Sequence, residues 1–256
     1  MNDEKYKKLQ EIVSKYDKAV ISFSGGVDST LVAKITYDIL HDNAIAITID
    51  SNMISEDEIE DARNMAKEIG IRHRIVKENF LLYGDVIENS NQRCYFCKRH
   101  FVRILKRIAM SENADVIFDG TNADDMKEYR PGLKAIREGD IVSPLAEVGL
   151  TKDEIRELSK KLGLSNYAKY SNTCLATRIP YGRIITKEKL KRIEIAERIL
   201  KNLKIRYIRV RDYDDTAIIE AFKKDFSIIM ENSDYITNEF NKLDFTYVTY
   251  KNGFKY

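Results

Sequence analysis

The chain has 256 residues, and 43 Lys and Arg nearly balance 41 Asp and Glu, which leaves a net charge of +2. This balance argues against a strongly basic nucleic-acid binder, and only 3 prolines and 11 glycines argue against low-complexity segments. No apolar run approaches the roughly 20 residues that cross a membrane, and the charged first residues do not resemble a signal peptide. We therefore expect a cytoplasmic protein without membrane contact.

The first half of the chain alternates short apolar runs with amphipathic helix patterns. With short connections, this alternation predicts a parallel sheet with helices on both faces. Ligands bind such sheets beyond the carboxyl ends of the strands. The predicted strands cover 19–23, 44–49, 73–76 and 116–119. One predicted helix spans 6–13, a second begins at Asp28, a third runs from a capping box at 55–58 to Gly70, and a fourth runs from near Arg93 through Ile108.

The second half of the chain changes character after Gly182. Before it, a capping box at Thr151–Glu154 opens a helix that closes at Gly163. After it, the pattern predicts a long charged helix, strands 205–210 and 216–221 joined by a tight turn at 212–215, another helix and a final strand 245–250. We therefore expect an α/β domain over residues 1–182 and a small α+β domain over 183–256.

A glycine turn follows the first predicted strand, in the stretch Ser24-Gly-Gly-Val-Asp-Ser-Thr30. Such a turn directs backbone N–H groups at one point, where the helix dipole also favours an anion, and glycine lets the backbone approach a phosphate without a clash. No Gly-Lys-Ser/Thr follows, so the segment is not a Walker A loop. The alternative is a turn without a ligand. The residues that we expect to bind nucleotide at the strand ends are Ser24, Gly25, Gly26, Asp28, Ser29, Thr30, Asp50, Ser51 and Gly120.

Three acidic residues lie at these strand ends. We expect Asp28 to bind a divalent ion, since Mg²⁺ combines one or two carboxylates with phosphate oxygens; the alternative is an acid favoured only by the helix dipole. For Asp124 and Asp125, a role toward metal or ribose and a role in helix capping are equally open.

The three cysteines are Cys94 and Cys97, three apart at the start of a predicted helix, and Cys174 in a predicted loop. In a non-secreted chain this odd number indicates metal or catalytic thiols rather than disulfides. Three interpretations stay open: buried thiols, a zinc site that His100 completes, and an iron–sulfur cluster held by three thiolates, with one iron left for an external ligand.

Several motifs in order give the chain a family resemblance. Ser-Gly-Gly-Val-Asp-Ser resembles the signature of the PP-loop ATP pyrophosphatases, with their adenine nucleotide α-hydrolase-like fold, which cut ATP between the α and β phosphates. The motifs that follow it are Arg93-Cys-Tyr-Phe-Cys-Lys98, Asp119-Gly-Thr-Asn-Ala-Asp-Asp125, Tyr129-Arg-Pro-Gly132 and Cys174-Leu-Ala-Thr-Arg-Ile-Pro-Tyr-Gly182. Together they resemble the LarE family of ATP-dependent sulfur transferases, which act in nickel-pincer cofactor synthesis. The resemblance runs from the PP-loop to about Arg211.

The resemblance implies a reaction. The family adenylates a carboxylate of pyridinium-3,5-biscarboxylic acid mononucleotide, releases pyrophosphate and forms a thiocarboxylate. In one branch a single sacrificial cysteine, which corresponds to Cys174, gives the sulfur. In the other branch two further cysteines join it in holding a [4Fe-4S] cluster. Because this chain has Cys94 and Cys97, it resembles the cluster branch, which implies ATP, Mg²⁺, a sulfide donor and a homo-oligomer.

Arginines near the Cys174 loop and on one strand face suggest a phosphate site. Arg178 and Arg183 flank the loop, and Arg209 and Arg211 share a strand face. Each guanidinium can bind a phosphate through two hydrogen bonds, and the substrate implied by the resemblance carries one; the alternative is a solvated strand face. We expect Cys174, Asp28 and Arg178 to act in catalysis.

Other acidic and aromatic residues are better explained without a site. Glu194 and Glu197 fit a solvated helix face, and Tyr207 fits packing better than base stacking. A tRNA-thiolating PP-loop enzyme, which needs a broad basic surface, and a non-catalytic ATP- or zinc-binding regulator are the competing functions.

Overall fold

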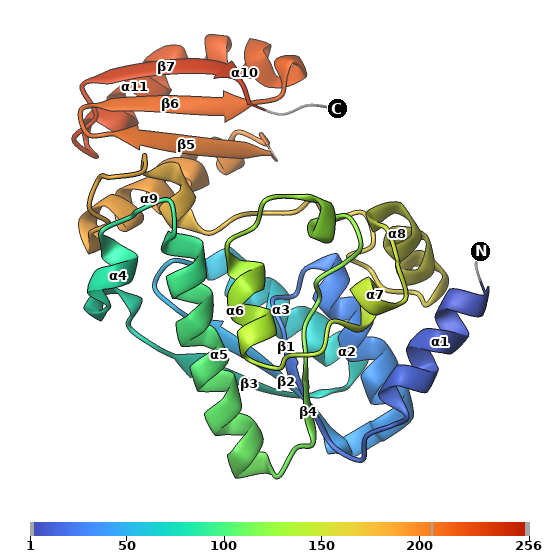
Figure 1. Cartoon of the computed structure of the whole chain (residues 1–256). Coiled ribbons are helices and arrows are strands. Elements are labelled where there is room, and N and C mark those ends of the chain that lie inside the picture. Colours follow the sequence, from blue (N-terminus) through green and yellow to red (C-terminus); the bar gives the residue numbers. More distant parts are fainter. Residues whose placement is uncertain (1–2, 206, 254–256) are drawn as a thin grey trace. The chain divides into compact units, whose positions relative to one another are not determined.

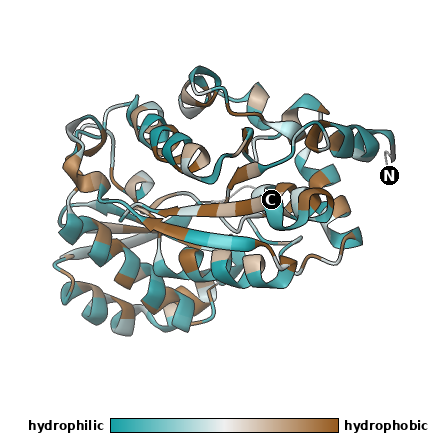
Figure 2. Cartoon of the chain, turned by 90° about the horizontal axis from the view of Figure 1, so that it is seen from below, coloured by the Kyte–Doolittle hydropathy of each residue, from teal (hydrophilic) through white to brown (hydrophobic). Residues whose placement is uncertain are grey.

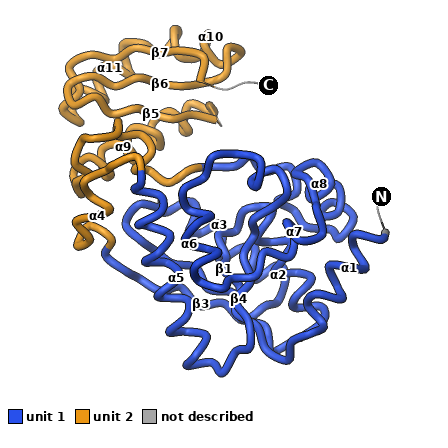
Figure 3. Tube along the Cα trace, in the orientation of Figure 1, with its two compact units in different colours: residues 1–79, 92–172 blue, residues 80–91, 173–256 orange. Residues whose placement is uncertain are grey.

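A computed structural model describes residues 3–205 and 207–253 (Figure 1). The chain divides into two compact units (Figure 3). Unit 1 comprises the residues up to Asn79 and Gln92–Asn172, and unit 2 comprises Phe80–Asn91 and the residues from Thr173 onward. Among the described residues, no helix is long and apolar enough to span a membrane.

Unit 1 is built on a four-stranded sheet in which every pairing is parallel. The strands are β1 (Ala19–Ser22), β2 (Ala44–Asp50), β3 (Arg72–Lys77) and β4 (Val116–Phe118), in the order β3-β2-β1-β4. Ala19 is in register with Ala44 on one side and with Val116 on the other. The predicted parallel sheet is therefore confirmed, and the ends of β1, β2 and β4 meet at one edge.

Helices pack on the two faces of this sheet because successive strand residues point to opposite sides. Ala19 and Ile21 belong to one core cluster with apolar residues of α1, α2 and α3. Val20, which lies between them in sequence and therefore points to the other face, is also buried, and α5 packs against β1. The helices carry hydrophobic and hydrophilic positions on different sides (Figure 2). Their bounds are α1 (Asp3–Val13), α2 (Val27–Leu40), η1 (His41–Asn43), α3 (Glu56–Ile69), α5 (Arg93–Glu112), η3 (Asp125–Lys127), α6 (Gly132–Glu138), α7 (Pro144–Glu147) and α8 (Lys152–Lys161).

The two predicted capping boxes have different outcomes. At α8, Thr151 and Glu154 make both reciprocal bonds. At α3, the helix begins after Ser55 and ends at Gly70, whose φ of 83° is left-handed, but the Ser55 side chain makes no cap hydrogen bond. The helix prediction at Ser55 is confirmed and the capping box there is wrong, because the Ser55 hydroxyl is buried without a partner among the described residues.

Unit 2 is an α+β unit on a three-stranded sheet in the order β5-β6-β7. The β5 and β6 strands form the predicted hairpin, in which Asp214 has a φ of 66°, and β7 joins β6 in parallel. One sheet face packs on α9, α10 and α11 through a single apolar cluster of the described residues. The bounds are η2 (Phe80–Leu82), α4 (Gly84–Ile87), η4 (Leu175–Arg178), α9 (Lys187–Asn202), β5 (Ile208–Tyr213), β6 (Thr216–Ala221), η5 (Lys223–Asp225), α10 (Phe226–Glu231), α11 (Ser233–Asn241) and β7 (Tyr247–Asn252).

The division between the units falls at Asn172/Thr173, before the predicted domain boundary at Gly182. The Gly182 N–H donates to the Asn89 carbonyl, and the Ile185 N–H donates to the Ile87 carbonyl. These bonds hold the segment around Gly182 against residues 80–91, within unit 2. The division into domains 1–182 and 183–256 stays a prediction.

Candidate functional site

The glycine turn is fixed by two close backbone approaches. Gly25 has a φ of +68°, and a Cβ atom there would lie 2.7 Å from the Cα of Ala62. A Cβ atom on Gly120 would lie 2.8 Å from the Ser29 backbone nitrogen. Only glycine fits at either position. The structure therefore brings the end of β4 against the first turn of α2, as the positions of these residues after two neighbouring strands predict.

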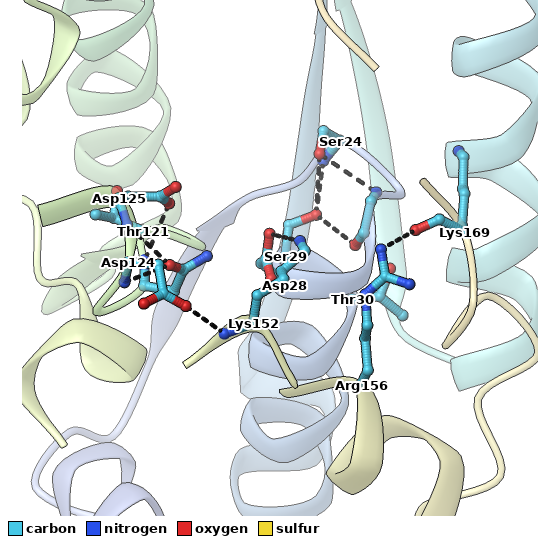
Figure 4. Close-up of polar contacts among 12 residues, drawn as sticks. Ser24, Asp28, Ser29, Thr30, Thr121, Asp124, Asp125, Lys152, Arg156 and Lys169 are labelled. Carbon is cyan, nitrogen blue, oxygen red and sulfur yellow. Dashed lines mark hydrogen bonds and ion pairs between the residues drawn. The ribbon is translucent and has the colours of Figure 1, made fainter. Parts of the chain in front are cut away.

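Hydroxyl groups line the turn (Figure 4). The Ser24 and Ser29 Oγ atoms are 3.1 Å apart, Ser29 Oγ accepts from the Ser24 N–H, and the Gly26 N–H donates to Ser24 Oγ. Gly26 is the N-cap of α2, and no side chain of the described residues caps this end. The positive end of the helix dipole is thus available to an anion at the predicted position.

Asn166 lies in the segment after α8 and hydrogen-bonds the turn. Its Nδ2 donates to the Gly25 carbonyl and to Thr30 Oγ1, at 3.1 Å and 2.9 Å. Both Asn166 and Thr30 are buried. The amide therefore connects the two ends of the turn.

Asp28 lies in the first turn of α2 and contacts a lysine that no sequence motif indicated. Lys152 Nζ lies 2.5 Å from Asp28 Oδ2, whereas Asp28 Oδ1 is buried without a hydrogen-bond partner in the described part of the chain. One oxygen of this carboxylate is thus neutralised by an ammonium group, and the other remains available to a ligand.

Asp124 and Asp125 differ in environment. The Lys152 backbone N–H donates to Asp124 Oδ2 at 2.8 Å, and this bond lowers the pKa of Asp124. Asp125 accepts from the Asn122 N–H and pairs with Arg130, but burial raises the pKa of Asp125, and the charge of Asp28 acts in the same direction. Asp124 thus accepts from the first N–H of α8, which fits its capping alternative, while Asp125 belongs to the electrostatic surroundings of Asp28.

Asp50 and Ser51 lie where β2 ends, at the same sheet edge. Asp50 is half-buried and its carbonyl accepts from the Glu78 N–H, while Ser51 is buried. Their nucleotide-binding role stays a prediction.

In unit 2, Arg178 organises the turn that carries Cys174. Its side chain is 0% exposed and forms a two-point ion pair with Glu197, through Nε at 2.8 Å and Nη2 at 3.2 Å. Its Nη1 donates to the Thr173 carbonyl at 2.6 Å and to the Cys174 carbonyl at 3.2 Å. The geometry gives Arg178 a structural place beneath the turn, and it gives Glu197 a buried role in place of the solvated helix face that we expected.

The other arginines have different partners. Arg211 Nη1 donates to the Thr177 carbonyl at 2.6 Å, and its Nε bonds Glu220. Burial lowers the pKa of Arg209, and the charges of Arg178 and Arg211 add to that effect. Arg183 pairs with Asp214 in the β5–β6 turn. The structure thus brings Arg211 to the Cys174 turn, places Arg209 within electrostatic reach of Arg178 and Arg211, and directs Arg183 to the hairpin.

The cysteines are divided between the units: Cys94 and Cys97 begin α5 in unit 1, and Cys174 precedes η4 in unit 2. All three are partly exposed and outside any disulfide. Within the described residues, no group of three or more His, Cys, Asp or Glu side chains is placed to hold a metal ion. The metal sites stay predictions.

Comparisons with known proteins place this chain in a family. The family model for NAD synthase matches residues 3–188. An uncharacterized protein of Synechocystis is 39% identical over 97% of this chain and 94% of its own length. The pyridinium-3,5-bisthiocarboxylic acid mononucleotide synthase of Lactiplantibacillus plantarum is 31% identical over 91% of this chain and 84% of its own.

The chain belongs to the LarE family. The family lies within the PP-loop group that the NAD synthase model describes. One subunit of the glutamine-hydrolysing GMP synthase of Archaeoglobus fulgidus is a more distant relative, 29% identical over 81% of this chain and 70% of its own. LarE membership supports an ATP-utilising enzyme.

Sequence reasoning missed two residues that contact the PP-loop, Lys152 and Asn166. Lys152 lies inside the capping box at Thr151–Glu154, which by itself indicates only the start of a helix. Asn166 has no local signal. Their partners in the PP-loop are 124 and 136 residues away, so only the folded chain reveals them.

Proposed function

We propose that the protein is an ATP-dependent sulfur transferase. It adenylates a carboxylate of a small nucleotide, pyridinium-3,5-biscarboxylic acid mononucleotide, and releases pyrophosphate. Sulfide then replaces AMP on the activated carboxyl group, which becomes a thiocarboxylate. The observation that carries the proposal is the PP-loop, closed by the approaches at Gly25 and Gly120. The likeness to the bisthiocarboxylic acid mononucleotide synthase supports the choice of substrate.

Backbone N–H groups at the start of α2 bind the phosphates in this proposal, and Asp28 binds Mg²⁺. The buried Asp28 Oδ1, without a hydrogen-bond partner among the described residues, fits such a ligand. When bound, Mg²⁺ would neutralise charge on the phosphates. Asp50, Ser51 and the hydroxyls of Ser24 and Ser29 complete the nucleotide site.

Arg209 and Arg211 bind the phosphate of the mononucleotide or the pyrophosphate. The pKa of Arg209 is lowered by burial and by two neighbouring guanidinium groups, so an anion there relieves repulsion between cations. Arg178 is placed to hold the Cys174 turn, because its guanidinium donates to Glu197 and to residues 173–177. We therefore assign it a positioning role.

Cys94, Cys97 and Cys174 hold a [4Fe-4S] cluster in this proposal. The donor set fits, because three partly exposed thiols outside any disulfide match three thiolate ligands. When bound, the cluster would supply an iron position for sulfide from an external donor. Cys174 is then a ligand and keeps its sulfur.

The test of adenylation is pyrophosphate release with ATP and the biscarboxylic acid mononucleotide. We expect release that depends on this substrate, a thiocarboxylate product by mass spectrometry, and a loss of about a hundredfold or more in Asp28→Asn, equal to about 3 kcal/mol of barrier. ATP binding without pyrophosphate release would favour the non-catalytic regulator, and salt-sensitive binding of tRNA would favour the tRNA-thiolating alternative.

The test of the cluster is anaerobic purification with iron and acid-labile sulfide measured per chain. We expect about four of each, and Cys174 of unchanged mass after turnover. Zinc without sulfide would overturn the cluster, and loss of the Cys174 sulfur in proportion to product would show the sacrificial route instead.

A further inference from the structure

An ammonium group lies beside the carboxylate that the proposed function assigns to the metal. Lys152 Nζ is 2.5 Å from Asp28 Oδ2 (Figure 4). The charge of Lys152 also acts on Asp125, where it opposes the effect of burial on the pKa of that carboxyl group. Lys152 therefore compensates negative charge at the place where a divalent cation would do the same.

The backbone of Lys152 is anchored, and its side chain is the part that can move. Its N–H donates to Asp124, and the capping box of Thr151 and Glu154 fixes the helix start around it. Lys5 Nζ lies 2.8 Å from Glu154 Oε1 and so stabilises the same helix start. The Lys152 side chain is 25% exposed, so a change of rotamer can remove the ammonium group while α8 stays in place.

We propose that Lys152 is an internal counter-ion that neutralises Asp28 at the metal site when no nucleotide is bound. A free divalent ion on Asp28 Oδ1 is repelled by the ammonium group on Oδ2, or must displace it and leave it without its partner. A nucleotide phosphate brings negative charge that compensates the displaced ammonium. Metal binding is thereby coupled to nucleotide binding, and the site takes up the metal together with the nucleotide. This inference rests on the proposed ATP use.

The coupling can be measured without turnover. Mn²⁺ binding to the full chain is followed by electron paramagnetic resonance, with and without an ATP analogue that carries a methylene bridge between the α and β phosphates. Lys152→Met keeps the length of the side chain and removes its charge. We expect it to bind Mn²⁺ alone about tenfold or more tightly than the wild type does, the size of one hydrogen bond to a charged group. We also expect the analogue to enhance Mn²⁺ binding less in this variant.

Lys169→Met is the matched control. Lys169 pairs with Asp61 at 2.8 Å in the same unit and has a side chain 28% exposed, close to the 25% of Lys152. We expect its Mn²⁺ affinity to equal that of the wild type, and we expect Lys152→Arg to keep the suppression. Adding Asp28→Asn to Lys152→Met should remove the gained affinity, which locates the effect at Asp28.

Unchanged or weaker Mn²⁺ binding in Lys152→Met would overturn the inference, as would an equal gain in Lys169→Met. Far-ultraviolet circular dichroism confirms that each variant is folded. The proposed function fails separately. If the wild type does not bind the ATP analogue, the proposed ATP use is wrong. If the wild type binds the analogue but Lys152→Met leaves Mn²⁺ affinity unchanged, only the counter-ion role of Lys152 is overturned.

Discussion

At the scale of single residues, burial decides what a charged group can do. Arg178 is completely buried, and its guanidinium joins Glu197 on α9 to the backbone of the Cys174 turn. Arg183, by contrast, is 39% exposed in its ion pair with Asp214. Removing one partner from a buried pair leaves an uncompensated charge, whereas an exposed pair contributes little.

Arg178→Met should therefore lower the free energy of unfolding by about 3–5 kcal/mol, measured by urea denaturation. Arg183→Met is the control, with an expected change below about 1 kcal/mol. Replacing both Arg178 and Glu197 by Met should cost less than the single change, because no charge is left unpaired. Equal losses of stability in Arg178→Met and Arg183→Met would contradict a structural role for Arg178.

Gly25→Ala tests the close approach at the PP-loop. The new Cβ would meet the Ala62 backbone at 2.7 Å, so the turn must shift, and we expect ATP affinity to fall about tenfold or more, equal to about 1.4 kcal/mol. Gly149→Ala is matched, since its φ is +69° but, apart from its chain neighbours, none of the described residues lies within 4 Å of the added Cβ. It should cost about 1 kcal/mol of stability for the left-handed backbone with unchanged ATP affinity, measured by calorimetry. Similar ATP affinities in the two variants would contradict the prediction.

At the scale of elements, hydrogen bonds at helix starts decide which caps stabilise. Thr151→Ala removes a complete capping box at α8 and should lower the free energy of unfolding by about 1 kcal/mol. Ser55→Ala should change it by less than about 0.5 kcal/mol, because this hydroxyl caps nothing and is buried without a partner in the described chain. Urea denaturation of both variants checks the difference. A larger loss of stability in Ser55→Ala would contradict the absence of a cap hydrogen bond from Ser55.

On β3, His73 gives the fold a pH dependence. Burial lowers the pKa of His73, and the charge of Arg63 acts in the same direction. The unfolded chain therefore takes up a proton near pH 6.5, before the folded protein does. Stability should fall as the pH drops from about 6.5 toward the lower pKa of the folded state. The slope of the urea midpoint against pH should be flatter in His73→Gln, and an unchanged slope would contradict this cause.

At the scale of the whole molecule, the proposed cluster depends on three cysteines that lie far apart in the sequence, Cys94 and Cys97 near one another and Cys174 alone. Serine at any one of the three should remove most of the iron and the visible absorbance of the cluster. Binding of the ATP analogue serves as the control and should persist, because the PP-loop contains no cysteine. Full iron content in any single variant would remove that cysteine from the ligand set.

Local sequence was enough for most elements and for the position of the PP-loop. The apolar runs at 19–23 and 44–49 indicated the strands, because buried parallel strands accommodate continuous apolar residues. The glycines at 25 and 120 followed from the strand ends, where the backbone must turn sharply. The role of Glu197 and the lysine partner of Asp28 were missed, because burial and ion pairing depend on elements far along the chain.

By itself, the sequence determined the parallel sheet, the PP-loop and the family, because hydrophobic period, glycine positions and ordered motifs are local properties. Only the tertiary structure decided which charges meet. It paired Lys152 with Asp28 across 124 residues and buried Arg178 against Glu197. Ion pairs form between side chains that folding brings together, and no local pattern encodes that proximity.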